Sequence, residues 1–386
     1  MKLKDFFMSV LWLLVIDFLL GNATGIHRGA FSIFANTFVE SFTMIGLGLS
    51  VFGISKAIVN LLGGAISDKI GRKKMVLVGS FVCAFGGLFI AIATSYAYLL
   101  IGTALMGIGS GMAYVAIMTR MSEIVKTRQR GFSMGFFELF AYGGFSTGSI
   151  IAGFIASLYG LRAPFYLAFV LPLIGGVISY FLVTETMKTR PPTWKQELYA
   201  IKKYFKDVFP AHLGGFVSKV GDSLAWSFMP LYLKNFQMVP EKIGVVVGAF
   251  TLSWAFSQPF TGYASDRVGR KPLIILGLLI EAVSMIVFTF TKNYYFLVIL
   301  STLMGLGTGF YYVEFPAMVG DISPPKVCGT IIGSYRFFRD MGYFVGPFLL
   351  GVIADTYGLV NIFYVTAGLL LITAIAIFKI AKETVK

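Results

Sequence analysis

The sequence predicts an all-α membrane protein with 12 transmembrane helices, arranged as two six-helix bundles related by a parallel repeat. Apolar residues make up 57% of the 386 residues and charged residues only 13%, which is more apolar surface than a water-soluble core can bury. Apolar runs of roughly 20 to 28 residues recur along the chain, and each is long enough to cross a bilayer as a helix. The second half of the chain also repeats the first, so the fold contains two copies of one unit.

The segment from Met75 to Thr119 shows how neighbouring spans are separated. It holds no Lys, Arg, Asp or Glu. As one helix it would be roughly 67 Å long at about 1.5 Å per residue, more than twice the hydrocarbon thickness of a bilayer. It therefore contains two spans, with the polar turn Thr94-Ser95-Tyr96 between them. The same reasoning along the whole chain gives about twelve spans.

The net charge of +14 is compatible with nucleic-acid binding, but the positions of the basic residues favour a membrane instead. Most of the 32 Lys and Arg residues fall in alternate predicted loops, on the same side of the membrane as both ends of the chain. The opposite loops hold only Arg162, Lys234, Lys242 and Lys292. Cytoplasmic loops of membrane proteins carry the excess of Lys and Arg, so we expect a protein of the cell membrane with both termini cytoplasmic and no nucleic-acid partner.

A tandem repeat with an offset of 198 residues runs through the chain without a gap. GAISDKIGRKK at 64–74 overlies GYASDRVGRKP at 262–272, and LMGIGSG at 105–111 overlies LMGLGTG at 303–309. An offset of six spans keeps both halves in one orientation, so they should be related by an axis along the membrane normal. We place the first bundle at 1–186, a basic cytoplasmic linker at 187–207 and the second bundle at 208–386.

Two short loops, one in each half, carry the pattern Gly-x-x-x-Asp-x-x-Gly-Arg-Lys. The residues concerned are Gly64, Asp68, Gly71 and Arg72 in the first half, and Gly262, Asp266, Gly269 and Arg270 in the second. Together with the repeat, these loops resemble the signature loop of the major facilitator superfamily. The resemblance covers nearly the whole chain, and it implies a 12-helix transporter that works by alternating access.

A basic loop with an acid at a helix end can lock two bundles in one state by pairing with other charges. We expect Glu123 and Asp321, at the ends of the fourth and tenth spans, to pair with Arg72 and Arg270 in such a cytoplasmic gate. The alternative is that these are solvated charges that only set the topology.

The fourth and fifth spans depart from the drug and proton antiporters of that superfamily. Those antiporters usually carry an arginine a turn before the glycines of the fourth span, where this chain has Thr103 and Met106. The fifth span has glycines without the antiporter proline, whereas the eleventh span has Gly346-Pro347. The GIGSG segment at 107–111 follows no strand, so close helix packing explains it better than dinucleotide binding.

Ionisable side chains inside a span cost about 2.5–3.5 kcal/mol each, so each one must be paired, water-facing or functional. Asp17, Gly21, Thr24 and Arg28 follow 4-3-4 spacing on one face of the first span, which is typical of a water-lined stripe. Snorkelling to the membrane surface is the alternative for Arg28. Lys56 lies too deep in the second span to snorkel easily, and we expect it to contact either the substrate or a buried acid such as Asp17.

Two further helices carry opposite charges at sequence spacings that allow an ion pair within the helix. Lys219 and Asp222 are three apart in the seventh span, and Arg336 and Asp340 are four apart in the eleventh. Arg339 then has no partner in its own helix.

Glu138 in the fifth span is the repeat-equivalent of Arg336, and we expect these two residues to face each other across a central cavity. Asp17, Glu138 and Asp222 are candidate proton carriers, because burial favours the protonated carboxyl. Permanent ion pairing is the alternative. Packing is the alternative for the aromatic residues that we place on the cavity wall, which are Tyr114, Tyr142, Trp226, Trp254, Tyr312, Tyr335 and Tyr343.

These features predict a monomeric secondary transporter, without a cofactor or a metal, that couples a small-molecule substrate to protons across the lipid bilayer. Efflux of hydrophobic or cationic compounds suits buried acids with aromatic walls. Uptake or exchange of an organic anion is the alternative, because Arg28 and Lys56 loosely resemble the organophosphate antiporters, although Trp226 stands at the repeat-equivalent position of Arg28. A membrane sensor that does not transport is the alternative of another class. The sequence shows no His-Glu metal motif and no serine-base-acid set, so we do not expect an enzyme.

Overall fold

The computed structural model describes residues 3–124, 130–183, 185, 194–324 and 327–385. Within these ranges the chain forms helices and connecting loops and no strand. The helices of the first half are α1 (Leu3–Ala35), α2 (Phe42–Ile70), α3 (Arg72–Ala91), α4 (Tyr96–Ile124), α5 (Arg130–Tyr159) and α6 (Ala163–Leu182). Those of the second half are α7 (Trp194–Ser223), the π-helix η2 (Leu224–Phe228), α8 (Met229–Lys234), α9 (Pro240–Val268), α10 (Arg270–Phe288), α11 (Tyr294–Tyr312), α12 (Glu314–Ile322), α13 (Cys328–Tyr357) and α14 (Leu359–Ile380).

Eleven helical segments of the described residues are long and apolar enough to cross a membrane. The twelfth crossing is the continuous run of α7, η2 and α8, which begins in the basic linker and carries Lys219 and Asp222 in its interior. These charges lower its mean hydropathy, although its length is sufficient. The predicted fold of 12 transmembrane helices in two bundles is therefore confirmed. The boundaries at residues 186 and 208 stay predictions.

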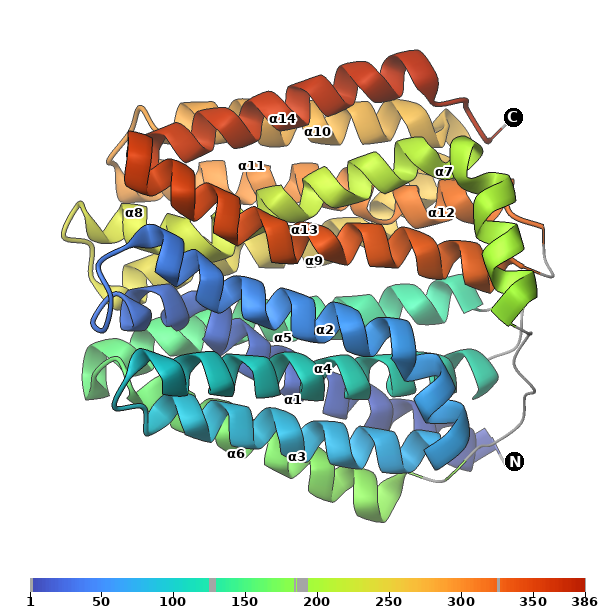
Figure 1. Ribbon diagram of the computed structural model, residues 1–386, viewed down its shortest axis with the longest axis horizontal. Helices are drawn as coiled ribbons and strands as arrows, with labels where there is room; N and C mark the ends of the chain where they lie inside the picture. The colour runs from blue at the N-terminus through green and yellow to red at the C-terminus, as the bar shows by residue number, and fades with distance from the viewer. Residues whose placement is uncertain (1–2, 125–129, 184, 186–193, 325–326, 386) are drawn as a thin grey trace.

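The two bundles lie side by side with their helices along a common direction (Figure 1). Helices α1–α6 pack among themselves, and α7–α14 do the same. Both ends of the described chain lie at the same end of the molecule, as an even number of crossings requires. The loops α1–α2 and α8–α9 lie at the opposite end, which we call the loop end.

Helices α1 and α5 pack backbone against backbone, and two glycines make this possible. A Cβ atom at Gly25 would overlap the carbonyl oxygen of Phe145, and one at Gly148 would overlap that of Asn22. Ser149 then donates a hydrogen bond of 2.9 Å from Oγ to the carbonyl oxygen of Gly25. Small residues that let helices approach are the usual means of association in membranes, where the hydrophobic effect does not act between helices.

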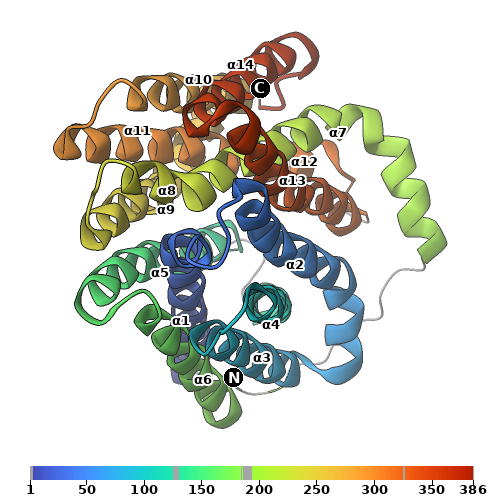
Figure 2. The ribbon, with the colours of Figure 1, turned by 60° about the vertical axis from the view of Figure 1, so that its left-hand side comes forward.

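The two halves meet along α2 against α13 and α5 against α9 (Figure 2). At the loop end these contacts are close. A Cβ at Gly46 would overlap the carbonyl oxygen of Pro347, and one at Gly153 would lie 2.5 Å from the carbonyl oxygen of Pro240. The structure is therefore closed at the loop end by direct backbone packing between the halves.

Asp355, near the end of α13, adds a polar contact to this closure. Its carboxylate accepts hydrogen bonds from Ser41 Oγ (2.7 Å), the Phe42 backbone N–H (2.7 Å) and the Thr43 backbone N–H (2.9 Å). The two N–H groups belong to the first residues of α2 and have no partner within the helix, so an acid from the second half caps a helix of the first.

We expect Asp355→Ala to weaken the closure of the loop end. Loss of a helix cap costs about 1 kcal/mol, which shifts an open-to-closed equilibrium about fivefold. The measurement is the rate of maleimide labelling of a single cysteine introduced at Thr43, in a protein whose Cys83 and Cys328 are replaced by alanine. Asp355→Asn, which keeps one acceptor oxygen, should show a smaller increase. An unchanged labelling rate in Asp355→Ala would show that the contact does not hold the halves together.

Candidate functional site

A small cavity lies between the two halves, near the middle of the crossing helices. Its free volume is about 40 Å³, which is room for only a few water molecules. Drug-sized ligands need roughly 300–1,000 Å³, so an organic substrate fits only after the halves move apart. The predicted site residues that line it are Asp17, Arg28, Lys56, Glu138 and Arg339, and the aromatic residues that line it are Phe52, Tyr114, Tyr142, Phe145, Trp226, Tyr312 and Tyr343.

Arg28 occupies an aromatic cage on the cavity wall. Its guanidinium carbon lies 4.6 Å from the ring centroid of Phe52, 4.8 Å from that of Trp226 and 5.1 Å from that of Tyr343. The side chain is 3% exposed, and within the described residues its Nε and Nη1 atoms have no hydrogen-bond partner. Arg28 is therefore held by cation–π contacts and keeps N–H donors free for another group. It does not snorkel.

Lys56, Asp17 and Glu138 also line the cavity without forming an ion pair within the described chain. The Lys56 ammonium lies 5.2 Å from the ring centroid of Tyr114, and the Tyr114 hydroxyl donates a 2.6 Å hydrogen bond to Glu138 Oε1. The second oxygen of Glu138 and Oδ2 of Asp17 are buried, and neither has a partner among the described residues. Both carboxyls are thus free to bind a proton or a cation.

Two ion pairs stand beside these free charges. Lys219 Nζ lies 2.5 Å from Asp222 Oδ2, the pair that the spacing predicted. Arg339 Nη2 lies 2.7 Å from Asp340 Oδ1, and Asn60 of the first half donates a 2.8 Å hydrogen bond to Asp340 Oδ2. Lys219, Asp222 and Asp340 lie behind the cavity wall, whereas Arg339 reaches it.

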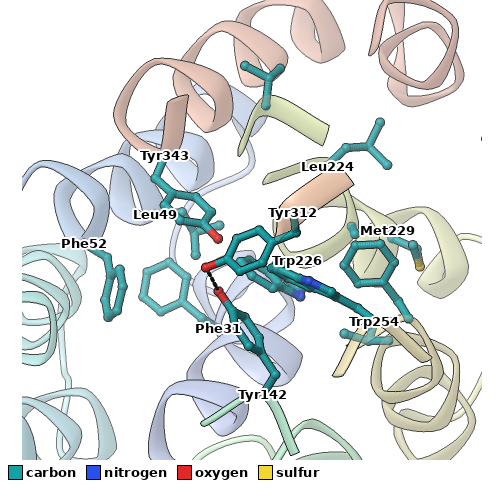
Figure 3. Packing of buried hydrophobic residues seen from close by; sticks show 14 of the residues in the cluster. Phe31, Leu49, Phe52, Tyr142, Leu224, Trp226, Met229, Trp254, Tyr312 and Tyr343 are labelled. Carbon is teal, nitrogen blue, oxygen red and sulfur yellow. Dashed lines mark hydrogen bonds between the residues drawn. The ribbon is translucent and has the colours of Figure 1, made fainter. Parts of the chain in front are cut away.

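The aromatic residues form one cluster that spans both halves (Figure 3). The hydroxyls of Tyr142 on α5 and Tyr312 on α11 are 2.7 Å apart, and Arg339 Nη1 donates to Tyr312 Oη at 3.2 Å. The rings of Trp226 and Trp254 stack at 5.8 Å. Trp254 packs behind this wall. Trp226 lies in η2, and π-helical turns of this kind often occur at functional sites.

Two predicted pairings are wrong. Arg336 does not pair with Asp340, because Asp340 binds the neighbouring Arg339, which is the residue expected to lack a partner. Arg336 does not pair with Glu138 either. Its Nη1 donates a 2.8 Å hydrogen bond to Met118 Sδ. The Glu138 carboxylate accepts a hydrogen bond from the Tyr114 hydroxyl instead. A tyrosine ring therefore separates the two charges, and Arg336 does not line the cavity.

Arg270 in the signature loop of the second half forms ion pairs with three acids. Its Nε lies 3.0 Å from Asp321 Oδ2, its Nη1 lies 3.1 Å from Glu314 Oε2, and its Nη2 lies 3.2 Å from Asp266 Oδ1. The contact with Asp321 is the one that the repeat predicted. In the first half, the side chains of Asp68 and Glu123 and the surroundings of Gly64 lie outside the part that the structure describes, so the pairing of Arg72 with Glu123 stays a prediction.

Gly71 and Gly269 end α2 and α9 with φ angles of 98° and 94°, a conformation that favours glycine. A carboxylate fills the space where each Cβ would stand, that of Glu185 in the first half and that of Glu383 in the second. Glu185 accepts from the Arg72 backbone N–H at 2.9 Å, and Glu383 accepts from that of Arg270 at 2.9 Å. The signature glycine thus lets a distant acid cap the next helix.

The Glu383 contact gives the cap a dependence on pH. Partial burial alone would raise the pKa of Glu383, but backbone N–H groups of Val385, Arg270, Lys271 and Thr384 donate to the carboxylate and hold its pKa below the ordinary 4.5. A depressed carboxyl pKa stabilises the fold above the unfolded-state pKa, and this stability is lost as the pH falls through the folded-state value.

We expect Glu383→Gln to remove this part of the acid sensitivity. The wild-type protein should lose thermal stability relative to the variant as the pH falls from neutrality to below 4.5, because only the wild type must protonate a hydrogen-bonded carboxylate. Thermal unfolding measured across this range tests the sign. Parallel curves for both proteins would rule out the cap as a pH-dependent contact.

Four acids in the site region were not found from the sequence. Glu281 is the single acid of α10, so the rule that identified Asp17 would have found it, and Glu314 follows closely after the apolar α11. Glu185 and Glu383 occupy equivalent positions in the repeat, which was a usable signal. Among the described residues, no three His, Cys, Asp or Glu side chains lie close enough to hold a metal ion.

The sequence pattern of the Major Facilitator Superfamily matches residues 13–212 and again residues 211–386. The chain belongs to this superfamily. Both halves match separately, so the resemblance carried by the two signature loops and the repeat is confirmed. The protein is therefore a multi-pass membrane transporter of this superfamily.

Individual relatives are distant. The chain is 24% identical over 343 residues to "Multidrug resistance protein MdtG" of Salmonella arizonae, a match that covers 86% of this chain and 83% of the relative. Among solved structures it is similar to the nucleoside transporter NupG, with a TM-score of 0.82 and 15% identity over 97% of this chain and all of that one. A D-xylose-proton symporter gives a TM-score of 0.79 and 17% identity, and the match covers 98% of each chain. These structures share the fold of the superfamily.

Proposed function

We propose that this superfamily member is a proton-coupled secondary transporter that exports hydrophobic or cationic organic compounds. The observation that carries the proposal is the central cavity, which combines aromatic walls with Asp17 and Glu138. Each of these carboxyls has one buried oxygen without a hydrogen-bond partner among the described residues. Aromatic rings bind apolar and cationic bodies, and a buried acid without a counter-ion readily binds a proton. The distant likeness to a multidrug resistance protein supports a hydrophobic or cationic organic substrate.

We place the ends of the chain and the signature loops on the cytoplasmic side, because most basic residues lie at that end. The closed loop end then faces outward. Alternating access would open the loop end by breaking the contacts at Gly46, Gly153 and Asp355. The acids that bind Arg270 all lie in the second half, so this cluster would move with that half as one unit. The cavity between the halves would be exposed to each side in turn.

Transport of an organic anion is the second candidate, and Arg28 favours it. The free guanidinium N–H groups lie beside Trp226 and Tyr343, so an acidic group could be bound while a flat apolar body stacks on the rings. Arg28 and Asp17 are eleven residues apart on α1, roughly 16 Å at 1.5 Å per residue, so the cavity has a basic region and an acidic region.

A binding experiment separates the two candidates. Purified protein is titrated with a lipophilic cation and, separately, with an aromatic carboxylate of similar size, and binding is followed by quenching of tryptophan fluorescence at Trp226. Tighter binding of the cation that is lost in Asp17→Asn/Glu138→Gln supports export of cations. Tighter binding of the carboxylate that is lost in Arg28→Gln supports the second candidate. Binding of neither compound would contradict both assignments.

A further inference from the structure

Glu281 is a buried acid in the middle of α10, inside the second half and away from the central cavity. Its side chain has no exposed surface. Tyr311 of α11 donates a hydrogen bond of 2.5 Å to Glu281 Oε2, while Oε1 has no partner among the described residues. No cation of the described chain forms an ion pair with it. A carboxylate buried in this way is unfavourable, whereas a neutral carboxyl is tolerated.

The carboxyl of Glu281 lies directly against α7. A Cβ atom at Gly221 would stand 2.9 Å from Oε1 of Glu281, and Gly221 is followed by Asp222. Asp222 Oδ1 likewise has no partner among the described residues, whereas its Oδ2 is bound by Lys219 and accepts a 3.2 Å hydrogen bond from Tyr343. The Glu281 carboxyl therefore lies against the turn of α7 that carries the Lys219–Asp222 pair, and Lys219 is paired with Asp222 alone.

Among the described residues, the other helices beside α10 bring no further charge to Glu281. Tyr311 is the titratable group that reaches it from α11. On α14 the titratable groups are Tyr364 and Lys379, of which Tyr364 bonds to Thr289 beyond one end of α10 and Lys379 lies near the other end. The acids of α9 and α12 that approach α10 bind Arg270, its first residue. Lys219 is thus the nearest cation, and it is already paired.

We propose that Glu281 is a second proton-binding site, outside the central cavity, whose occupancy is linked to the Lys219–Asp222 pair. With Glu281 protonated, the three groups carry no net charge. When the Glu281 O–H bond breaks and water accepts the proton, they carry one negative charge, and Lys219 must then be shared by two carboxylates. Its ammonium lies 4.5 Å from the ring centroid of Tyr312 and 5.0 Å from that of Tyr343, both on the cavity wall. Proton release at Glu281 would therefore shift the Lys219 ammonium, which contacts the aromatic rings of the cavity wall.

The role of this site in coupling rests on the proposed function, but proton binding itself is measured separately. Infrared difference spectra of the full chain in lipid, recorded as the pH is raised from neutral, report the C=O band of protonated carboxyls. We expect the wild type to lose a band that Glu281→Gln lacks and that Tyr311→Phe shifts in frequency. Cys83→Ala, at the repeat-equivalent position in the first half, is the matched control and should leave the band in place.

The transport readout uses the same variants in liposomes. Glu281→Gln mimics the protonated state, so solute exchange at equal pH should continue, while solute transport driven by a pH gradient should fall at least tenfold. A band that persists in Glu281→Gln, or a wild-type response of that variant to the pH gradient, would overturn the proposal. A requirement for sodium in place of the pH gradient would overturn the role of Glu281 in coupling. If the wild type moves no protons with solute but the band is lost in Glu281→Gln, the proton site stands and the proposed function fails.

Discussion

Asp222→Asn is expected to be among the most destabilising single substitutions in the chain, at about 3–5 kcal/mol, the cost of breaking a buried ion pair by removing one partner. Lys219 is 1% exposed, and its cation–π contacts with Trp254 and Tyr312 do not replace the lost carboxylate charge. The measurement is unfolding in mixed micelles with increasing denaturing detergent, followed by tryptophan fluorescence.

The control is the double variant Lys219→Met/Asp222→Leu, which removes both charges. Replacing a whole buried pair by apolar residues is often neutral, so the double variant should be considerably more stable than Asp222→Asn. If the single and double variants were equally unstable, the loss would come from packing. Equal stability of Asp222→Asn and wild type would mean that Lys219 has water or another anion beside it.

Arg28→Gln is expected to weaken the binding of an aromatic carboxylate by about 10- to 150-fold, if this chain takes organic anions. A hydrogen bond to a charged group contributes roughly 1.5–3 kcal/mol, which corresponds to that range of affinity. The substitution removes the charge, while Gln keeps an amide that fits among the rings of Phe52, Trp226 and Tyr343. Isothermal titration measures the affinity directly.

Arg28→Lys is the matched control, because lysine keeps the charge but lacks the planar fork of N–H donors. It should fall between wild type and Arg28→Gln for the carboxylate. For a lipophilic cation, Arg28→Gln should bind as well as wild type or better, because a like charge is removed. Unchanged carboxylate affinity in Arg28→Gln would show that the aromatic cage serves packing alone.

The fold could be predicted from the sequence because a lipid bilayer permits few backbone structures to cross it. Long apolar runs must become helices, and the 198-residue repeat with its six spans determines how the halves are related. The seventh crossing was also predictable, even though Lys219 and Asp222 lower its mean hydropathy, because its repeat-equivalent is the clearly apolar α1.

The partners of the charged residues were harder to predict, because helix spacing limits which residues share a face but does not fix side-chain rotamers. Arg339 turns back onto the adjacent Asp340, although neighbouring residues point in different directions on an ideal helix. Tyr114 stands between Arg336 and Glu138, so opposite charges at equivalent positions of the repeat did not meet. Contacts of this kind depend on the packing of several helices at once.

The contacts between the halves also needed the structure. In the sequence, Asp355 is a polar residue near a loop, with no pattern that predicts a partner. Only the packing of α13 against α2 brings its carboxylate within hydrogen-bond distance of three donors of the other half. Arg28 and Asp17 line the same cavity, as their spacing on one face of the first span indicated. Its aromatic cage could not be foreseen, because the three rings come from α2, η2 and α13.

The most direct test of the account is proton movement in liposomes that contain the purified protein and an internal pH dye. Lipophilic cations are added first, then aromatic carboxylates. We expect proton flux with one of the two classes, and we expect Asp17→Asn or Glu138→Gln to abolish it. Proton flux that persists in both variants would contradict the role given to the two cavity carboxyls. No flux with either class, together with no binding, would contradict coupled transport and favour a membrane sensor.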